Sequence, residues 1–212
     1  MSYTIQVVDM QGKEVKKHDL PTNIFAEEKV NQGLIHEYVV MYLANQRQST
    51  AHTKTRGEIR GSGRKLYAQK GSGKARVGDA ASPIRRKGGT VFGPRNERNW
   101  SKAMPKKMKV KALTSAVSLK AQADKIMGLD AYTVEKMKTK EAVATLKSIG
   151  LDGVKTLLVT AGKDESVIRT FNNIPTVKMT TVNQLNAYDV MSTKQILFVG
   201  EALAQFISRV SA

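Results

Sequence analysis

The sequence of 212 residues contains no cysteine. This absence excludes disulfide bridges, thiol catalysis, and zinc or iron–sulfur sites that use cysteine ligands. The chain also lacks the apolar run of about 18 residues that a membrane-spanning helix requires, so we expect no membrane partner. Residues 1–15 do not show the basic region followed by an apolar region that is typical of a secretory signal. Together these absences predict a soluble, intracellular protein.

Acidic residues are scarce in one stretch, from Arg47 to Lys109. This stretch contains 18 Lys and Arg residues against three acids, and therefore carries +15 of the chain's net charge of +17. It also contains nine of the 16 glycines. No apolar period of two or 3.6 residues runs through it, so it cannot build a core of its own. A loop of this length within a compact domain is expected to be functional or disordered.

Clustered positive charge suits a polyanion, because binding to phosphates releases condensed counterions. Glycine permits close approach of the backbone, and arginine presents a planar fork that reaches two phosphate oxygens. Four groups that can stack on bases, Tyr67, Phe92, Trp100 and His52, are interleaved with the cations. A solvated linker is the alternative interpretation, but a spacer has no use for these aromatic residues. The stretch therefore predicts binding to a polyanion, such as a nucleic acid or another anionic surface.

Outside the basic stretch, short apolar strands alternate with amphipathic helices. We expect strands at residues 3–8, 14–20, 126–131, 156–160, 177–182 and 195–199. We expect helices at residues 25–46, 110–125, 140–149, 165–172 and 201–210, and a short helix or turn at 185–190.

This alternation predicts an α/β fold with a mostly parallel sheet and helices on both faces, a Rossmann-like three-layer sandwich. The globular domain would comprise residues 1–46 and 110–212. An extended, basic, glycine-rich loop at residues 47–109 would interrupt it between two helices.

No group of catalytic or cofactor-binding residues stands out. The segment GSGK at residues 71–74 resembles part of a phosphate-binding loop, but no apolar strand precedes it and Ala75 occupies the position that needs Ser or Thr. The histidines, at positions 18, 36 and 52, lack the spacing of metal ligands. We therefore expect no cofactor, no metal and no enzymatic activity. An RNA-modifying enzyme remains an alternative that would need a cofactor loop and a catalytic group.

Four motifs in and after the basic stretch point to a known family: GSGRK at 61–65, QKGSGKAR at 69–76, SPIRRKGG at 82–89 and KKMKVKAL at 106–113. They resemble the universal large-subunit ribosomal protein L-four family in its bacterial form. With the flanking α/β pattern, the resemblance covers essentially the whole chain. One segment departs from it, because Leu66-Tyr67-Ala68 stands where many members have Pro-Trp-Arg.

The resemblance implies a cytoplasmic protein, a structural constituent of the large ribosomal subunit that binds large-subunit rRNA early in assembly. Its loop would thread into rRNA, and the loop tip, with Gln69, Lys70 and Gly71, would line the polypeptide exit tunnel. Neighbouring large-subunit ribosomal proteins would be further partners. Some bacterial members repress their own operon, so a free RNA-binding factor, or a repressor that binds its own leader mRNA, remains an open alternative.

The residues expected to contact rRNA are Arg47, Lys54, Arg56, Arg60, Arg64, Lys65, Tyr67, Lys70, Lys74, Arg76, Arg85, Arg86, Lys87, Arg95, Arg98 and Trp100.

Overall fold

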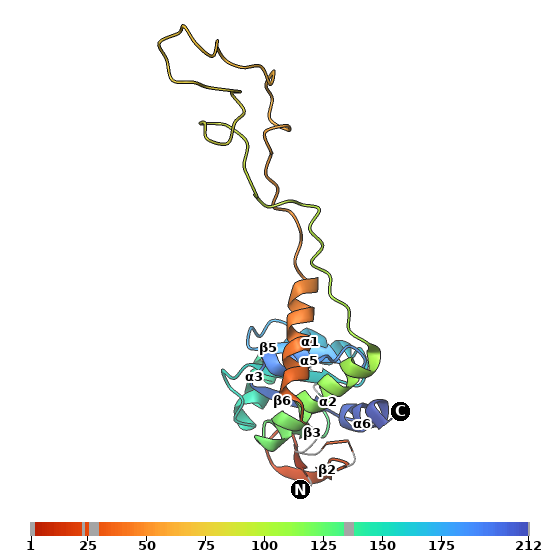
Figure 1. Cartoon of the computed structure of the whole chain (residues 1–212). Coiled ribbons are helices and arrows are strands. Elements are labelled where there is room, and N and C mark those ends of the chain that lie inside the picture. Colours follow the sequence, from red (N-terminus) through yellow and green to blue (C-terminus); the bar gives the residue numbers. More distant parts are fainter. Residues whose placement is uncertain (1–2, 23, 26–29, 134–137, 212) are drawn as a thin grey trace. The chain divides into compact units, whose positions relative to one another are not determined.

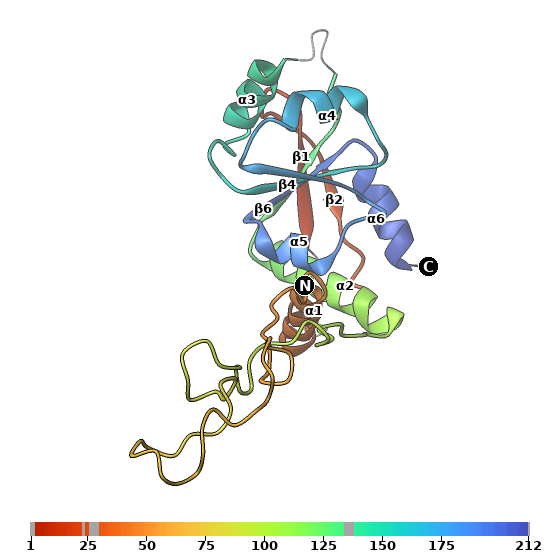
Figure 2. The same ribbon diagram turned by 90° about the horizontal axis from the view of Figure 1, so that it is seen from above.

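The computed structural model describes residues 3–22, 24–25, 30–133 and 138–211. The chain forms two units, one made of Met1–Leu43 with Ala103–Ala212 and the other of Ala44–Lys102. The strands are β1 (Thr4–Val8), β2 (Glu14–Asp19), β3 (Ile126–Leu129), β4 (Thr156–Thr160), β5 (Val177–Thr181) and β6 (Gln195–Val199). The helices are α1 (Gln32–Asn45), α2 (Lys106–Gln122), α3 (Thr139–Ser148), α4 (Glu165–Phe171), α5 (Ala187–Ser192) and α6 (Ala202–Ser211). Figures 1 and 2 together label these elements, and the ribbon colours follow the sequence.

The described strands form one sheet in the order β2-β1-β3-β6-β4-β5. Strands β1 and β2 form an antiparallel hairpin, whereas the other neighbouring strands pair in parallel. In the register of the central strands, Leu158 of β4 lies beside Leu197 of β6 and Met179 of β5. The expectation of a mostly parallel sheet is therefore confirmed.

Side chains of the central strands alternate between two cores, one on each face of the sheet. In β4, Leu157 and Val159 pack with residues of α1, α2, α5 and α6, whereas Leu158 packs with residues of α3 and α4. All three side chains are fully buried. Figure 2 shows α3 and α4 on one side of the sheet and α5 on the other. This arrangement confirms the expected helices on both faces.

Helix α1 begins later than the sequence suggested. The amides of Ile24 and Phe25 both donate to the carbonyl of Pro21, at 3.1 and 3.0 Å, so these residues lie in a turn. The Oδ1 atom of Asn31 accepts from the amide of Leu34 at 2.9 Å and caps the helix that follows. The expected start at residue 25 is therefore wrong, and residues 26–29 lie outside the described residues.

Helix α2 also has other limits than expected. It begins at Lys106 rather than at Val110, because Pro105 fixes the backbone just before the first turn. It ends at Gln122 rather than at residue 125, since Asp124 has a left-handed φ of 53°. The last basic residues of the stretch, from Lys106 onwards, therefore lie in a helix.

The second unit is built without regular secondary structure. Within its described residues, no helix or strand follows the end of α1, apart from an isolated antiparallel bridge between Lys65 and Asp79. Bends, turns and irregular segments make up the rest. The backbone conformation of this unit therefore depends on individual hydrogen bonds and close contacts.

Candidate nucleic-acid interface

Hydrogen bonds join two arms of the second unit, residues 45–58 and 88–102. The side-chain amide of Asn45 donates to the carbonyl of Lys102 at 3.1 Å and accepts from its backbone N–H at 2.8 Å. Farther along, the amide of Thr53 donates to the carbonyl of Pro94 at 3.0 Å. The trace in Figure 1 can be followed up one arm and down the other. These bonds hold the arms in register although no sheet forms.

An ion pair between Arg95 and Glu58 connects the same two arms. The guanidinium donates to both carboxylate oxygens, at 2.8 and 2.9 Å. The amide of Thr55 also donates to this carboxylate, at 2.8 Å. The hydrogen bonds from Arg95 and then from Thr55 lower the pKa of Glu58 to about 2. The sequence did not identify Glu58 as a residue of this interface. The only indication that the sequence offers is that Glu58 is one of three acids among many cations.

Two glycines allow segments of the loop backbone to approach one another closely. A Cβ atom on Gly89 would lie 2.2 Å from the backbone nitrogen of Arg56, and one on Gly88 would lie 1.9 Å from the carbonyl oxygen of Ser82. The amide of Gly89 donates to the carbonyl of the buried Ala81 at 2.9 Å. Any side chain at these two positions would push backbone away from backbone.

The tip of the loop is closed by a bond between the amide of Leu66 and the carbonyl of Gly78, at 3.1 Å. Inside it, the Tyr67 hydroxyl donates to the carbonyl of Ala75, so this phenol is already engaged within the chain. The expected tip residues, Gln69–Gly71, lie in this closed segment, and all of them are exposed. The exposed surface of these three residues is available to a binding partner.

Trp100 lies between residues that were also predicted to bind RNA. The guanidinium carbons of Arg47 and Arg98 lie 3.5 and 4.0 Å from the centroid of its ring. Such cation–π contacts hold a guanidinium at a fixed place while its N–H groups remain free to donate. The structure therefore brings Arg47, Arg98 and Trp100 together, although 53 residues separate the first from the last.

The cations of the second unit are almost all exposed, and almost all lack an ion-pair partner among the described residues. Of the 15 Lys and Arg residues from Arg47 to Lys102, 14 are exposed, and Arg95 is the half-buried exception. Among described residues, Arg95 is also the one cation of this range in an ion pair. The predicted cations do not gather in one cluster but follow both arms and the tip. Such a distribution suits a partner that is itself extended and negatively charged.

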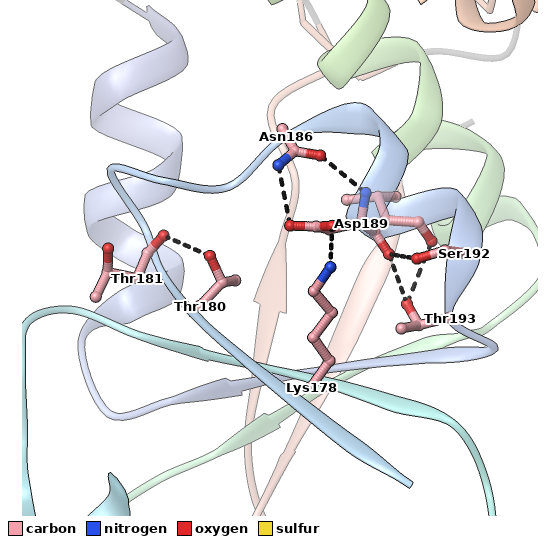
Figure 3. A network of polar contacts seen from close by, with 8 residues as sticks. Lys178, Thr180, Thr181, Asn186, Asp189, Ser192 and Thr193 are labelled. Atoms are coloured by element: carbon pink, nitrogen blue, oxygen red, sulfur yellow. Dashed lines mark hydrogen bonds and ion pairs between the residues drawn. The ribbon is translucent and has the colours of Figure 1, made fainter. Parts of the chain in front are cut away.

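The first unit contains a polar cluster around the buried Asp189 (Figure 3). Its carboxylate accepts from Lys178 Nζ at 2.5 Å and from Asn186 Nδ2 at 2.9 Å. The backbone amide of Asp189 donates to Asn186 Oδ1 at 2.9 Å, and its carbonyl accepts from the hydroxyls of Ser192 and Thr193. The bonds with Asn186, Ser192 and Thr193 cap and close the short helix α5, and the bond from Lys178 joins that helix to β5. The cluster therefore has a structural role that accounts for each of its bonds.

A crevice of about 230 Å³ lies beyond the carboxyl ends of β3 and β6, the edge where α/β sheets commonly bind ligands. Its charged residues include Lys16 and Asp130, which form an ion pair at 3.3 Å. No Ser, Thr, Tyr or Cys is among the described residues that line it.

Within the part of the chain that the structure describes, no three His, Asp or Glu residues are grouped so that they could hold a metal ion. No helix there has both the length and the apolar character needed to span a membrane.

Comparison with known proteins gives one consistent result. A family model described as "Ribosomal protein L4/L1 family" matches residues 18–209. The "Large ribosomal subunit protein uL4" of Symbiobacterium thermophilum is 43% identical over 202 residues, which cover 95% of this chain and 96% of that protein. The uL4 proteins of Carboxydothermus hydrogenoformans and Halothermothrix orenii are each 42% identical, covering 94% and 92% of this chain and 95% and 92% of their own lengths. The resemblance inferred from the sequence motifs is thus confirmed.

Proposed function

The chain belongs to the ribosomal protein L4/L1 family, and on this premise we propose that it is a structural constituent of the large ribosomal subunit rather than an enzyme. Its partners are large-subunit rRNA and neighbouring ribosomal proteins. In a bacterium, this places the chain in the cytoplasm, within the large subunit. Its contribution to translation is then to bind and order RNA.

The second unit, Ala44–Lys102, is proposed to be the rRNA-binding element. One observation carries this proposal: 14 exposed cations lie along the unit, without an ion-pair partner among the described residues. Lys and Arg side chains would neutralise phosphates where RNA helices pack closely. Recognition would follow RNA shape, because the deep, narrow major groove of an A-form helix hides the base edges.

The tip with Gln69, Lys70 and Gly71 is proposed to line the polypeptide exit tunnel. Its support is the resemblance of the QKGSGKAR motif together with two properties of the tip. The bond between Leu66 and Gly78 closes the tip, and residues 69–71 are exposed. A closed segment can present these residues at one place without support from a domain core.

The salt dependence of binding to purified large-subunit rRNA tests the rRNA-binding proposal. Changing Arg85, Arg86 and Lys87 together to Gln removes three exposed charges from the loop. Each lost phosphate contact should reduce the slope of log K against log salt by roughly 0.7–0.9. The triple variant should therefore show a slope smaller by up to about 2–3 and weaker binding at low salt.

A matched control removes the same charge from the first unit, by changing the exposed Lys140, Lys163 and Lys194 to Gln. This control should keep the slope and the affinity of the unchanged chain. Equal effects of the two triple variants would mean that net charge alone governs binding, and would contradict a loop-specific interface.

Co-sedimentation after a high-salt wash separates a ribosomal constituent from a free RNA-binding factor. A constituent stays on the large subunit, whereas a free factor, or a repressor that binds its own leader mRNA, is released. Release from subunits combined with tight binding to the leader mRNA would favour that alternative.

A further inference from the structure

Phe92 is a large apolar side chain in an unusual position. Its exposed fraction is 103%, so that its whole ring lies in water. Its backbone has a φ of 54°, in the left-handed region that bulky residues rarely adopt. Both features are unfavourable in the isolated chain, and a partner that covers the ring would offset the exposure.

The backbone on either side of Phe92 is fixed by the opposite arm. The amide of Thr90 donates to the carbonyl of Lys54 at 2.9 Å, and the amide of Thr53 donates to the carbonyl of Pro94 at 3.0 Å. A Cβ atom on the intervening Gly93 would lie 2.1 Å from the Thr53 hydroxyl oxygen. The backbone that carries Phe92 is therefore fixed by contacts made by its neighbours, while its ring stays exposed.

Phe92 lines a hollow of about 550 Å³ within the second unit, together with Ser49, Arg47, Arg98 and Trp100. This volume lies in the usual range of small-ligand sites, roughly 300–1,000 Å³. The two arginines are aligned on the Trp100 ring, 3.5 and 4.0 Å from its centroid, and both are exposed. One hollow thus offers an uncovered aromatic face and two aligned guanidinium groups.

We propose that this hollow binds an unpaired nucleotide of RNA, with the base stacked on Phe92 and phosphate oxygens of the same strand bound by Arg47 and Arg98. The inference rests on the proposed function as an rRNA-binding protein. Trp100 acts as a positioning residue that holds the two arginines. A base in a duplex is stacked on both faces, so an unpaired base is the one that Phe92 can reach.

The charge around the ring decides between an RNA and an apolar protein partner. An apolar protein surface laid over Phe92 would have to desolvate Arg47 and Arg98 without supplying a counter-charge, which is costly. A nucleotide supplies a flat ring and a phosphate at once. Ile84 is 94% exposed in the same unit but does not line this hollow, and it therefore serves as the control.

The test compares the full chain with Phe92→Asn, Phe92→Tyr and Ile84→Asn, using purified large-subunit rRNA as the probe. Asn tolerates the left-handed backbone and removes the ring, whereas Tyr keeps a stacking face. Phe92→Asn should raise the Kd about tenfold, as expected for the loss of one stacked base. Its salt slope should stay unchanged because no phosphate contact is removed. Phe92→Tyr and Ile84→Asn should stay within about twofold of the unchanged chain.

Trp100 is the single tryptophan of the chain, so its fluorescence reports on this hollow directly. Binding of rRNA should alter its emission in the unchanged chain, and Phe92→Asn should reduce that change. Ultraviolet crosslinking of the unchanged chain to rRNA, followed by peptide mass spectrometry, should find a nucleotide attached at Phe92.

The outcomes separate this inference from the function on which it rests. Unchanged affinity of Phe92→Asn, or equal loss in Phe92→Asn and Phe92→Tyr, would overturn stacking and leave rRNA binding intact. Crosslinks confined to other residues of the loop would also overturn it. Failure of the unchanged chain to bind rRNA would overturn both proposals.

Discussion

Glu58 is an acid that stabilises a basic loop. Its carboxylate receives two bonds from Arg95 and one from the amide of Thr55, so it joins arms that are 37 residues apart in sequence. A carboxylate in this position offsets the repulsion between cations on the two arms, so the arms can stay close together. Glu58 is exposed and Arg95 is only half-buried, and we therefore assign the pair a local role rather than a large share of global stability.

The pH dependence of this contact follows from the lowered pKa of Glu58, about 2 against an ordinary value of 4.5. Because the folded-state pKa is depressed, the contact contributes fully above about pH 4.5 and is lost as the pH falls through about 2. Carboxyl-carbon NMR should therefore show Glu58 still ionised at pH values where an ordinary glutamate is half protonated. Arg95→Gln should raise this pKa towards 4.5, whereas Arg98→Gln should leave it low. A Glu58 that titrates like an isolated side chain in the unchanged protein would contradict the contact.

Glycines of the loop should differ in what they tolerate. Gly89→Ala places a methyl group where the backbone nitrogen of Arg56 lies only 2.2 Å away, so the arms must separate. Gly61→Ala adds a methyl group with no atom within 4 Å. Amide resonances of residues 53–56 should shift widely in the first variant and hardly in the second, and rRNA affinity should fall only in the first. Similar behaviour of both variants would contradict the close approach at Gly89.

For single residues, the sequence could predict which side chains carry charge, but not which charged side chains already contact another residue of the chain. The exposure of Lys70 follows from its charge and its glycine neighbours. The pairing of Arg95 with Glu58 does not, because it depends on the register of two arms that no periodic pattern sets. The same holds for Trp100, which was expected to meet RNA and which contacts Arg47 and Arg98 in the structure.

Side-chain hydrogen bonds cap both ends of helix α5. Asn186 caps it by accepting from the amide of Asp189, and in return donates to the buried carboxylate of the same residue. The sequence suggested a short helix or turn at residues 185–190, and the structure places the helix at Ala187–Ser192. The side-chain caps determine where this helix begins and ends, and the spacing of apolar residues does not predict these limits.

Asn186→Ala should lower the free energy of unfolding by about 1–2 kcal/mol, because it removes the cap and one partner of a buried carboxylate. Urea unfolding followed by circular dichroism measures this change. Asn173→Ala, at an exposed asparagine, should change it by less than about 0.5 kcal/mol. Affinity for rRNA should be the same in both variants. Equal destabilisation by the two changes would remove the argument for the cap.

Several strands and helices were predicted correctly because their patterns are local. Strands β4 and β6 are apolar and β-branched, and both have the expected limits, Thr156–Thr160 and Gln195–Val199. The starts of α1 and α2 were missed. The Asn31 cap and Pro105, rather than the apolar period, determine where these helices begin.

Over the whole chain, the distribution of charged and apolar residues distinguishes two parts of the protein. One forms an α/β sandwich with a core on each face of its sheet, and the other is a cationic loop without regular structure. The strand order β2-β1-β3-β6-β4-β5 could not be derived from the sequence. It depends on which strand packs between β3 and β4, a matter of long-range packing rather than local preference.

The central claim is that the residues of the loop bind large-subunit rRNA. Chemical footprinting of purified rRNA with the full chain, and with a variant in which residues 47–100 are replaced by a short Gly-Ser linker, tests it most directly. Asn45 and Lys102 are hydrogen-bonded to each other, so a short linker can join the remaining ends. We expect a compact protected region of rRNA with the full chain and none of it with the variant. Equal protection by both proteins would place RNA binding on the α/β unit and contradict the claim.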